Sequence, residues 1–319
     1  MKQVRLFFAT TTSALCFIIN SRSQTAKTGD SSIPGVFEAS TPCNDVVKTM
    51  LGIPSNTKCE LLKWTLSLYN NPNNLSSSTF KLLCVYGLPK QGTRGFSEGA
   101  ETKEFQGKST IEKGIHENAN AVVYTLNVSD SPISLSFLKA GENLLHLLDG
   151  EKHLMVGNGA WSYTFNRISP VASSPENLFL KTTSHAMTDS SAIGVFDGRT
   201  PCYDVLRELN GIPANACQII KCKLTLYQDI KTHEPSTFLL QTIYVGAGDT
   251  KYSNTGKWKL TTGINHDPEG IVYELHFDKP HVSVALLKAD DNILFFLDKD
   301  RDLMVGNSYC SYTLNRQRK

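Results

Sequence analysis

The sequence lacks a large excess of charge of either sign. Its 319 residues include 32 basic and 30 acidic ones, which gives a formal net charge of +2. Both signs are mixed along the chain, apart from a short basic tail at Arg316, Arg318 and Lys319. A nucleic-acid-binding protein normally carries a clustered basic surface. We therefore expect no nucleic-acid partner.

Long hydrophobic runs are missing beyond the N-terminus. There, an apolar run from Leu6 to Ile19 follows Lys2 and Arg5 and precedes a small-residue segment that ends at Ser23. This order is typical of a secretory signal peptide, and the run is short for a transmembrane helix. We predict a signal peptide at residues 1–23 and an exported protein of the periplasm or cell envelope.

The same run contains Cys16, so lipid modification is the alternative to cleavage. A bacterial lipobox has a small residue directly before the cysteine and usually leucine three positions before it. Here Leu15 precedes Cys16, and Ser13 lies three positions before it, which is the reverse order. We therefore do not expect membrane tethering through Cys16.

The motifs of common enzyme classes are missing as well. The chain has no GxSxG elbow, no P-loop, no HExxH and no GxGxxG after a strand. We expect no catalytic residues, no cofactor-binding residues and no enzyme activity.

What the chain does have is an internal repeat. Leu138–Arg167 reads LKAGENLLHLLDGEKHLMVGNGAWSYTFNR, and Leu287–Arg316 reads LKADDNILFFLDKDRDLMVGNSYCSYTLNR, with 17 of the 30 positions identical. A tandem duplication predicts two domains of one fold. We place them at residues 34–168 and 193–319. Residues 169–192 are rich in Ser, Thr, Pro and Asn and are predicted to be a linker.

Apolar and polar residues alternate with the period of a β-strand in both units. Trp64, Leu66 and Leu68 fall on one face of their segment, and Cys222 and Leu224 begin the equivalent face in the second unit. Each unit has roughly eight such segments. They predict an all-β fold of two tandem small antiparallel barrels or sandwiches, in which closure removes exposed strand edges.

One segment of each unit has helical spacing instead. Residues 45–51 and 204–209 carry apolar residues at i, i+3 and i+4. Thr41 and Thr200 stand just upstream, each followed by proline, and are the predicted N-caps. A glycine after each segment is the predicted end.

Four cysteines recur between the units: Cys43 and Cys59 match Cys202 and Cys217. In an exported protein this pattern favours one disulfide per unit, which would contribute about 3 kcal/mol in the chain-entropy treatment. The alternative is a copper(I) or zinc thiolate site. Neither pair has CxxC spacing, and none of the eight histidines recurs at its aligned position.

Two other cysteines replace tryptophans. Alignment places Cys222 at the position of Trp64 and Cys310 at that of Trp161, and the alternation points both inward. We hypothesise a third disulfide, Cys222–Cys310, in place of a packed tryptophan pair; independent drift is the alternative. Cys84 has no counterpart and would be a free thiol.

Polar residues kept in both copies have two interpretations. Asn158 and Asn307 follow glycine, as in tight turns, and Arg167 and Arg316 close the last strand, where they can bind backbone or carboxylates. The functional interpretation is a ligand-binding rim at the mouth of each barrel.

The first unit also has about nine extra residues around Leu88 to Glu104, because the offset between copies falls from 158 at Phe80 to 149 at Gly107. Drift in a surface loop and a partner-binding loop are the two interpretations.

Several of these segments together resemble the N-terminal domain of the copper resistance lipoprotein NlpE family. They are Gly-Val-Phe…Thr-Pro-Cys, Lys-x-x-Leu-x-Leu-Tyr, Gly-Lys-Trp-x-Leu at Gly256 and Val-Tyr-x-Leu. The resemblance implies lipocalin-like barrels in the cell envelope, linked to copper tolerance or envelope-stress sensing. The family's Cys-x-x-Cys would start at Cys43 and Cys202, but Val46 and Val205 occupy its second position.

We therefore predict a non-enzymatic binding or sensing module whose partner is an unknown envelope protein or a small ligand. We predict no metal-binding residues, with copper as the one metal that the resemblance suggests. The alternative is a lipocalin-like carrier of a small apolar ligand. Small barrels are either filled by side chains or hold one small ligand, so a filled interior would argue against the carrier.

Overall fold

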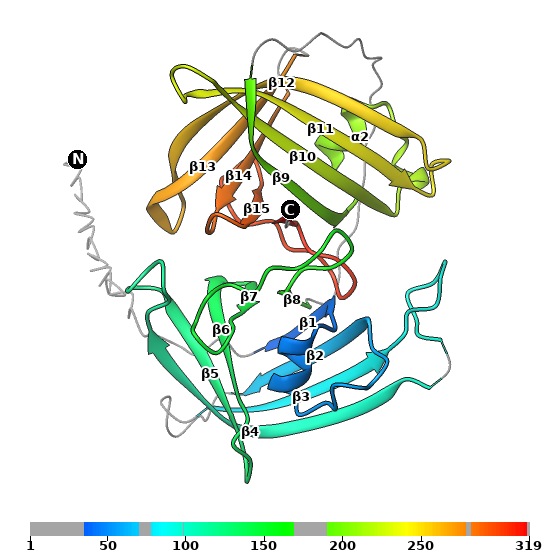
Figure 1. Cartoon of the computed structure of the whole chain (residues 1–319), viewed down its shortest axis with the longest axis vertical. Helices are drawn as coiled ribbons and strands as arrows, with labels where there is room; N and C mark the ends of the chain where they lie inside the picture. Colours follow the sequence, from blue (N-terminus) through cyan, green and yellow to red (C-terminus); the bar gives the residue numbers. More distant parts are fainter. Residues whose placement is uncertain (1–34, 70–77, 98, 169–189, 279–281, 318–319) are drawn as a thin grey trace, which may run out of the picture. The chain divides into compact units, whose positions relative to one another are not determined.

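The structure is a computed structural model, which describes residues 35–69, 78–97, 99–168, 190–278 and 282–317. The predicted signal peptide, with Cys16, lies outside these residues, and so does most of the predicted linker. The described strands form two closed antiparallel barrels of eight strands each (Figure 1). The predicted fold class is therefore confirmed.

The strands of the first barrel follow one another around its wall in sequence order. Backbone pairing of Glu38 with Asn166 and of Phe37 with Arg167 joins the last strand to the first and closes the barrel. The elements are β1 (Gly35–Pro42), α1 (Asp45–Met50), β2 (Leu61–Tyr69), β3 (Ser78–Gly87), β4 (Glu101–Lys113), β5 (Val122–Val128), β6 (Ser134–Gly141), β7 (Leu144–Leu147) and β8 (Thr164–Arg167).

The second barrel repeats this order and closes through the equivalent pairs, Asn315 with Asp197 and Arg316 with Phe196. Its elements are β9 (Ser190–Pro201), α2 (Asp204–Leu209), a 3-10 turn η1 (Ala214–Ala216), β10 (Ile219–Asp229), β11 (Pro235–Val245), β12 (Lys251–Ile264), β13 (Asp267–Phe277), β14 (Ser283–Lys288), β15 (Ile293–Leu297) and β16 (Thr313–Arg316).

The barrel interiors are packed with the apolar residues that the alternation predicted to face inward. Trp64, Leu66 and Leu68 on β2 are buried. The Phe165 ring makes edge-to-face contacts with Trp64, at 5.5 Å between centroids, and with Phe137, at 5.0 Å. Edge-to-face pairing is a favourable geometry for packed aromatic rings. The core of the first barrel therefore lies inside its wall.

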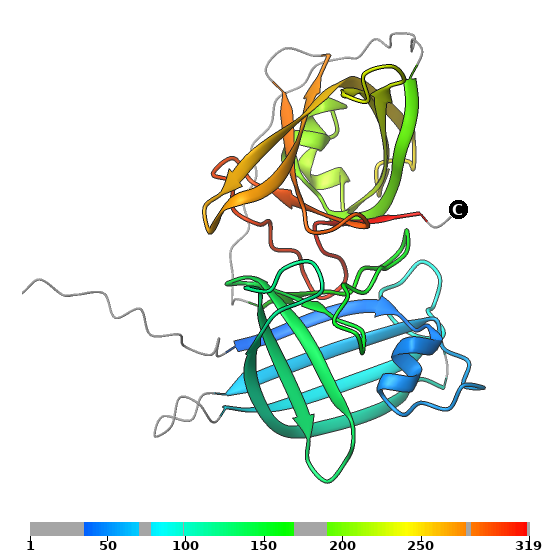
Figure 2. The same ribbon diagram turned by 60° about the vertical axis from the view of Figure 1, so that its left-hand side comes forward.

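Each short helix packs on the interior at one end of its barrel, as Figure 2 shows for α2. The predicted caps were wrong, because β1 and β9 continue through Pro42 and Pro201 and keep Thr41 and Thr200 in the sheet. Asn44 caps α1 instead, and its Oδ1 accepts from the Val47 amide at 3.0 Å. Both helices end within two residues of the predicted glycines.

The final strand of each barrel is shorter than the alternation suggested. β8 begins at Thr164 and β16 at Thr313, so Trp161 and Cys310 lie in the preceding turns. Trp161 is half-buried and does not belong to the core cluster that contains Trp64. The predicted tryptophan pair is therefore wrong, because strand periodicity does not extend to Trp161.

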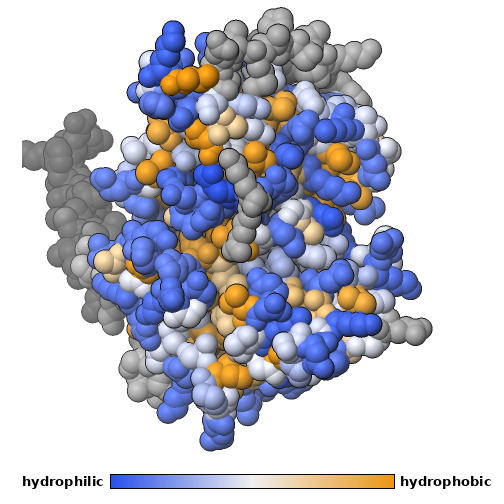
Figure 3. All heavy atoms as spheres, viewed as in Figure 1, coloured by the Kyte–Doolittle hydropathy of each residue, from blue (hydrophilic) through white to orange (hydrophobic). Residues whose placement is uncertain are grey.

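The outward faces of the strands are largely polar, which leaves mostly hydrophilic residues on the side of the molecule shown in Figure 3. Among the described residues, no helix has the length and apolar character that crossing a bilayer requires.

Candidate functional site

The two repeated cysteine pairs are disulfides. Cys43 is bonded to Cys59 with 5.6 Å between Cα atoms, and Cys202 is bonded to Cys217 with 6.0 Å. Each bond joins the start of the helical segment to the chain that enters the next strand. The thiolate metal-site alternative loses its ligands, since a disulfide offers no thiolate.

The hypothesised third disulfide is not formed: Cys222 and Cys310 are separate buried thiols, as is Cys84. Cys222 lies in the interior core on β10, whereas the Cys310 Sγ lies in the turn before β16, 3.8 Å from Asn307 Oδ1. The hypothesis relied on an inward alternation that does not reach Cys310. Burial raises the pKa of Cys222 and of Cys310 to about 12, so both are protonated at neutral pH and poor nucleophiles.

Asn158 and Asn307 shape the turns that follow the two Val-Gly pairs. Asn158 Oδ1 accepts from the amides of Ala160 and Trp161 at 2.8 and 2.9 Å. Asn307 makes the equivalent bonds to residues 309 and 310. This Asx-turn geometry supports the structural interpretation of both asparagines.

Arg167 and Arg316 hold the closing strands. Their guanidinium groups lie over the rings of Phe37 and Phe196 at 5.0 and 4.9 Å. Arg316 also donates to backbone carbonyls, including that of Ile193 at 2.9 Å. These cation–π and backbone contacts place both arginines at barrel closure, so the structural interpretation is favoured here too.

The turns of one barrel contact the closing strand of the other, and both barrels belong to one compact unit. The Gly157 amide donates to Asn315 Oδ1 at 2.8 Å, and the Gly306 amide donates to Asn166 Oδ1 at 2.7 Å. A Cβ on either glycine would lie 2.2 or 2.3 Å from a backbone oxygen of its own turn. The repeated Gly and Asn residues therefore form reciprocal bonds between the copies.

Residues at equivalent positions also contact each other directly along this seam. The hydroxyl oxygens of Ser162 and Ser311 are 2.6 Å apart, and those of Thr164 and Thr313 are 2.9 Å apart. Contact of a position with its own equivalent marks a two-fold relation, as in a symmetric homodimer. The seam is thus an internal pseudo-two-fold interface.

An apolar cluster completes the seam. It consists of Val123, Leu148 and Leu154 of the first barrel with Ile293 and Phe295 of the second. Burial of apolar surface stabilises such interfaces. At the seam, this apolar burial adds to the stabilisation from the hydrogen bonds between the two copies.

His146 lies at this seam and contacts its own equivalent, Phe295, with ring centroids 5.8 Å apart. Its Nδ1 is 3.0 Å from Thr164 Oγ1 and its Nε2 is 3.0 Å from the carbonyl oxygen of Met155. Complete burial lowers the pKa of His146 to about 4, so the imidazole is neutral. Sequence comparison set this histidine aside because the other copy has phenylalanine there.

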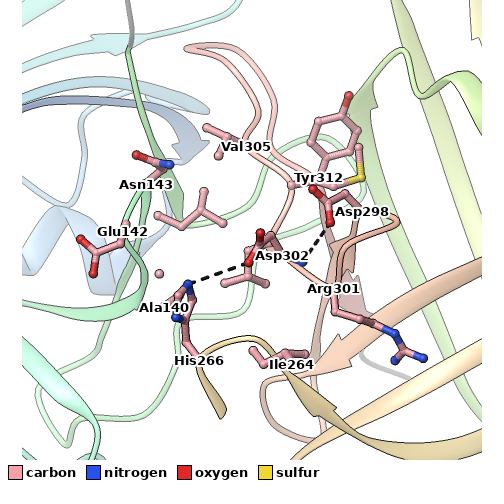
Figure 4. A pocket seen from close by; sticks show the side chains of 14 residues that line it. Ala140, Glu142, Asn143, Ile264, His266, Asp298, Arg301, Asp302, Val305 and Tyr312 are labelled. Carbon is pink, nitrogen blue, oxygen red and sulfur yellow. Dashed lines mark hydrogen bonds and ion pairs between the residues drawn. The ribbon is translucent and has the colours of Figure 1, made fainter. Parts of the chain in front are cut away.

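A hollow of about 510 Å³ lies beside the seam, and Figure 4 shows the side chains that line it. Residues 140–144 line one side, and Asp298 with residues 301–305 lines the other. His266 Nε2 is 3.8 Å from Asp302 Oδ1, and Arg301 forms an ion pair with a glutamate on β13. The charges of this hollow are therefore partly compensated within the protein.

Metal-binding side chains do not gather in the part of the chain that the structure describes: it contains no group of three or more His, Cys, Asp or Glu placed to hold a metal ion. The His116 and His153 rings are 4.6 Å apart at the surface. Met155 and Met304 pack against the two barrel cores.

Comparison with known proteins finds one family. The model of the NlpE N-terminal domain matches residues 210–307, which lie within the second barrel, and this confirms the resemblance noted from the sequence. The first barrel has the same strand order, consistent with a second copy that the match does not cover. No curated protein and no solved structure matches the chain.

Proposed function

Since residues 210–307 belong to the NlpE N-terminal domain family, we propose that the protein is a non-enzymatic binding or sensing module of the cell envelope. The family match carries this proposal, because NlpE is an envelope lipoprotein family and not an enzyme family. The two disulfides support it, since such bonds persist in oxidising compartments. The predicted signal peptide at residues 1–23 would deliver the chain there.

The filled barrel interiors support a module that binds through its surface. Phe37, Trp64, Phe137 and Phe165 are fully buried within one barrel, where a carrier would need an open apolar cavity. The alternative of a lipocalin-like carrier is thus disfavoured by packing.

The family resemblance implies either copper tolerance or envelope-stress sensing. The state of the cysteines at the CxxC position favours envelope-stress sensing. Val46 and Val205 occupy the second position of the CxxC motif, and Cys43 and Cys202 are in disulfides. Copper(I) prefers thiolate and thioether ligands, and these cysteines offer none.

Location and redox state test the first part of the proposal. The full chain is expressed in a bacterium, the cells are fractionated, and free thiols are alkylated before reduction. We expect an envelope fraction in which Cys43, Cys59, Cys202 and Cys217 react only after reduction. A cytosolic protein whose four thiols react directly would overturn the assignment.

Function is tested in cells that lack the gene. In these cells, an envelope-stress reporter should respond less strongly to envelope stress than in wild-type cells. Expression of the full chain should restore the response. An unchanged reporter would argue against sensing. Stoichiometric copper binding by the oxidised protein, or an apolar ligand in its solvent extract, would favour the rival functions.

A further inference from the structure

A second hollow, of about 520 Å³, lies at the two repeated turns. Residues 89–94, from the loop that only the first unit has, form one wall. Arg199 on β9 and Lys221 on β10 face them from the second barrel. Trp161 and Tyr309, from the two repeated turns, complete the lining.

This hollow is lined by cations without carboxylates. Lys90, Arg94, Arg199 and Lys221 all contribute to it, and none of its lining residues is acidic. Among the described residues, none of these four cations forms an ion pair. Grouped cations in a concave surface concentrate anions from solution.

A fifth cation lies close to the hollow and adds to its positive potential. Lys63 lies beside Arg94 and donates to its backbone carbonyl. The pKa of Lys63 is lowered first by burial and then by the like charge of Arg94, although Glu38 acts in the opposite direction. Arg94 itself is placed by cation–π contact, 5.5 Å above the Tyr309 ring. The protein therefore holds like charges close together here, which an anion would relieve.

Two residues that line the hollow each have a buried donor without a hydrogen-bond partner among the described residues. These donors are the indole Nε1 of Trp161 and the Nε of Arg199. A buried donor without a partner is destabilising, so native proteins normally satisfy such groups with a partner, water or ligand. The two aromatic rings add flat apolar surface beside these donors.

Apart from Lys221, whose equivalent is Lys63, the charged and aromatic residues that line the hollow are ones that the copies do not share. Arg199 stands where the first unit has Ser40, Tyr309 where it has Ala160, and Trp161 where the second unit has Cys310. The loop that carries Arg94 has no counterpart. Within the described residues, the pseudo-two-fold relation therefore does not repeat this set of residues.

We propose that this hollow binds one small organic anion, in which a carboxylate or phosphate is attached to a planar ring. Arg199 and Lys221 bind the anionic group, and Trp161 and Tyr309 contact the ring. The volume lies within the range of small-molecule sites, and the four cations surround a hollow instead of forming the extended basic stripe of a nucleic-acid surface. The proposal rests on the proposed binding function and names its ligand class.

Calorimetric titration of the purified full chain tests it with four probes: phenyl phosphate, benzoate, inorganic phosphate and benzylamine. We expect one-to-one binding of phenyl phosphate or benzoate, weaker binding of inorganic phosphate, and no binding of the cation benzylamine. If phenyl phosphate binds more tightly than benzoate, the natural ligand carries a phosphate; if benzoate binds more tightly, it carries a carboxylate. Added salt should weaken binding, because salt screens the attraction.

Matched variants locate the site. R199Q and R94Q should each weaken the binding of the tighter-binding probe about tenfold, which corresponds to about 1.4 kcal/mol of binding free energy. K223Q is the control, because Lys223 is exposed on the same strand as Lys221, two residues along, and does not line the hollow. Circular dichroism and thermal unfolding check that each variant is folded.

Binding of benzylamine as tight as that of phenyl phosphate would overturn the proposal. So would an absence of saturable binding by both ring-bearing anions, or affinities unchanged in R199Q and R94Q. If the protein is also found in the envelope and restores the stress reporter, such a result removes the anion site and leaves the proposed function intact.

Discussion

His146 is a buried imidazole whose surroundings favour its neutral form. It contacts Phe295, the residue at its own position in the other copy, and hydrogen-bonds Thr164 and the Met155 carbonyl. Burial lowers its pKa to about 4 from an ordinary value near 6.5. A proton that binds to this histidine therefore favours the unfolded chain.

This difference predicts a loss of stability in mild acid. The unfolded state takes up the proton below about pH 6.5, while the folded state does so only near pH 4. The contribution of neutral His146 to the free energy of unfolding is complete above pH 6.5. It declines as the pH falls to 4, by roughly 3 kcal/mol in all. Urea unfolding from pH 4.5 to 7.5 should show a smaller pH dependence for H146F than for wild type. Equal slopes for H146F and wild type would refute the buried neutral state.

The three buried thiols give a second residue-level prediction. Denatured, unreduced protein without residues 1–23 should titrate three free thiols, those of Cys84, Cys222 and Cys310. One free thiol would instead mean that Cys222 and Cys310 pair. Mass spectrometry after alkylation identifies the reactive positions.

At the scale of elements, the alternation predicted the strands well because inward positions must be apolar wherever a barrel wall separates core from water. The errors lie at the ends of elements. Thr41 and Thr200 match a capping signal, which is local, whereas β1 and β9 extend through long-range pairing with the next strand. The alternation predicts a strand at Cys310, but β16 begins only at Thr313.

The helical segments depend on their disulfides. Each helix has only six residues, too short to be stable alone. Removing Cys202–Cys217 as C202A/C217A should lower the free energy of unfolding by about 3 kcal/mol, and C43A/C59A should do the same. Urea denaturation measures both against C84A, a buried cysteine outside any disulfide. A double variant no less stable than C84A would contradict the role of these bonds.

At the scale of the whole molecule, the residues common to both copies build the scaffold, and the unshared ones shape the hollow with Arg94 and Arg199. The sequence singled out the Gly-Asn turns and the Asn-Arg ends, yet it did not predict which copy holds their partners. Two identical motifs pair equally well within one copy or between copies, so repetition alone cannot distinguish the two. The bonds from Gly157 to Asn315 and from Gly306 to Asn166 required three-dimensional placement.

The cation-lined hollow was beyond sequence reasoning for the same reason. Its positive residues come from three separate segments, residues 90–94, Arg199 and Lys221, and do not form a run. The available signals were the extra loop of the first unit and the exchange of Trp161 for Cys310. Both mark the hollow, but neither identifies its charge.

Amide hydrogen exchange at Gly157 and Gly306 tests the reciprocal seam most directly. We predict that both amides are protected in the wild-type chain. N315A should speed exchange at Gly157 at least about tenfold and leave Gly306 protected, and N166A should do the reverse, because each change removes one acceptor across the seam. Rapid exchange of both glycines in the wild type, or no effect of either variant on its partner glycine, would contradict the seam.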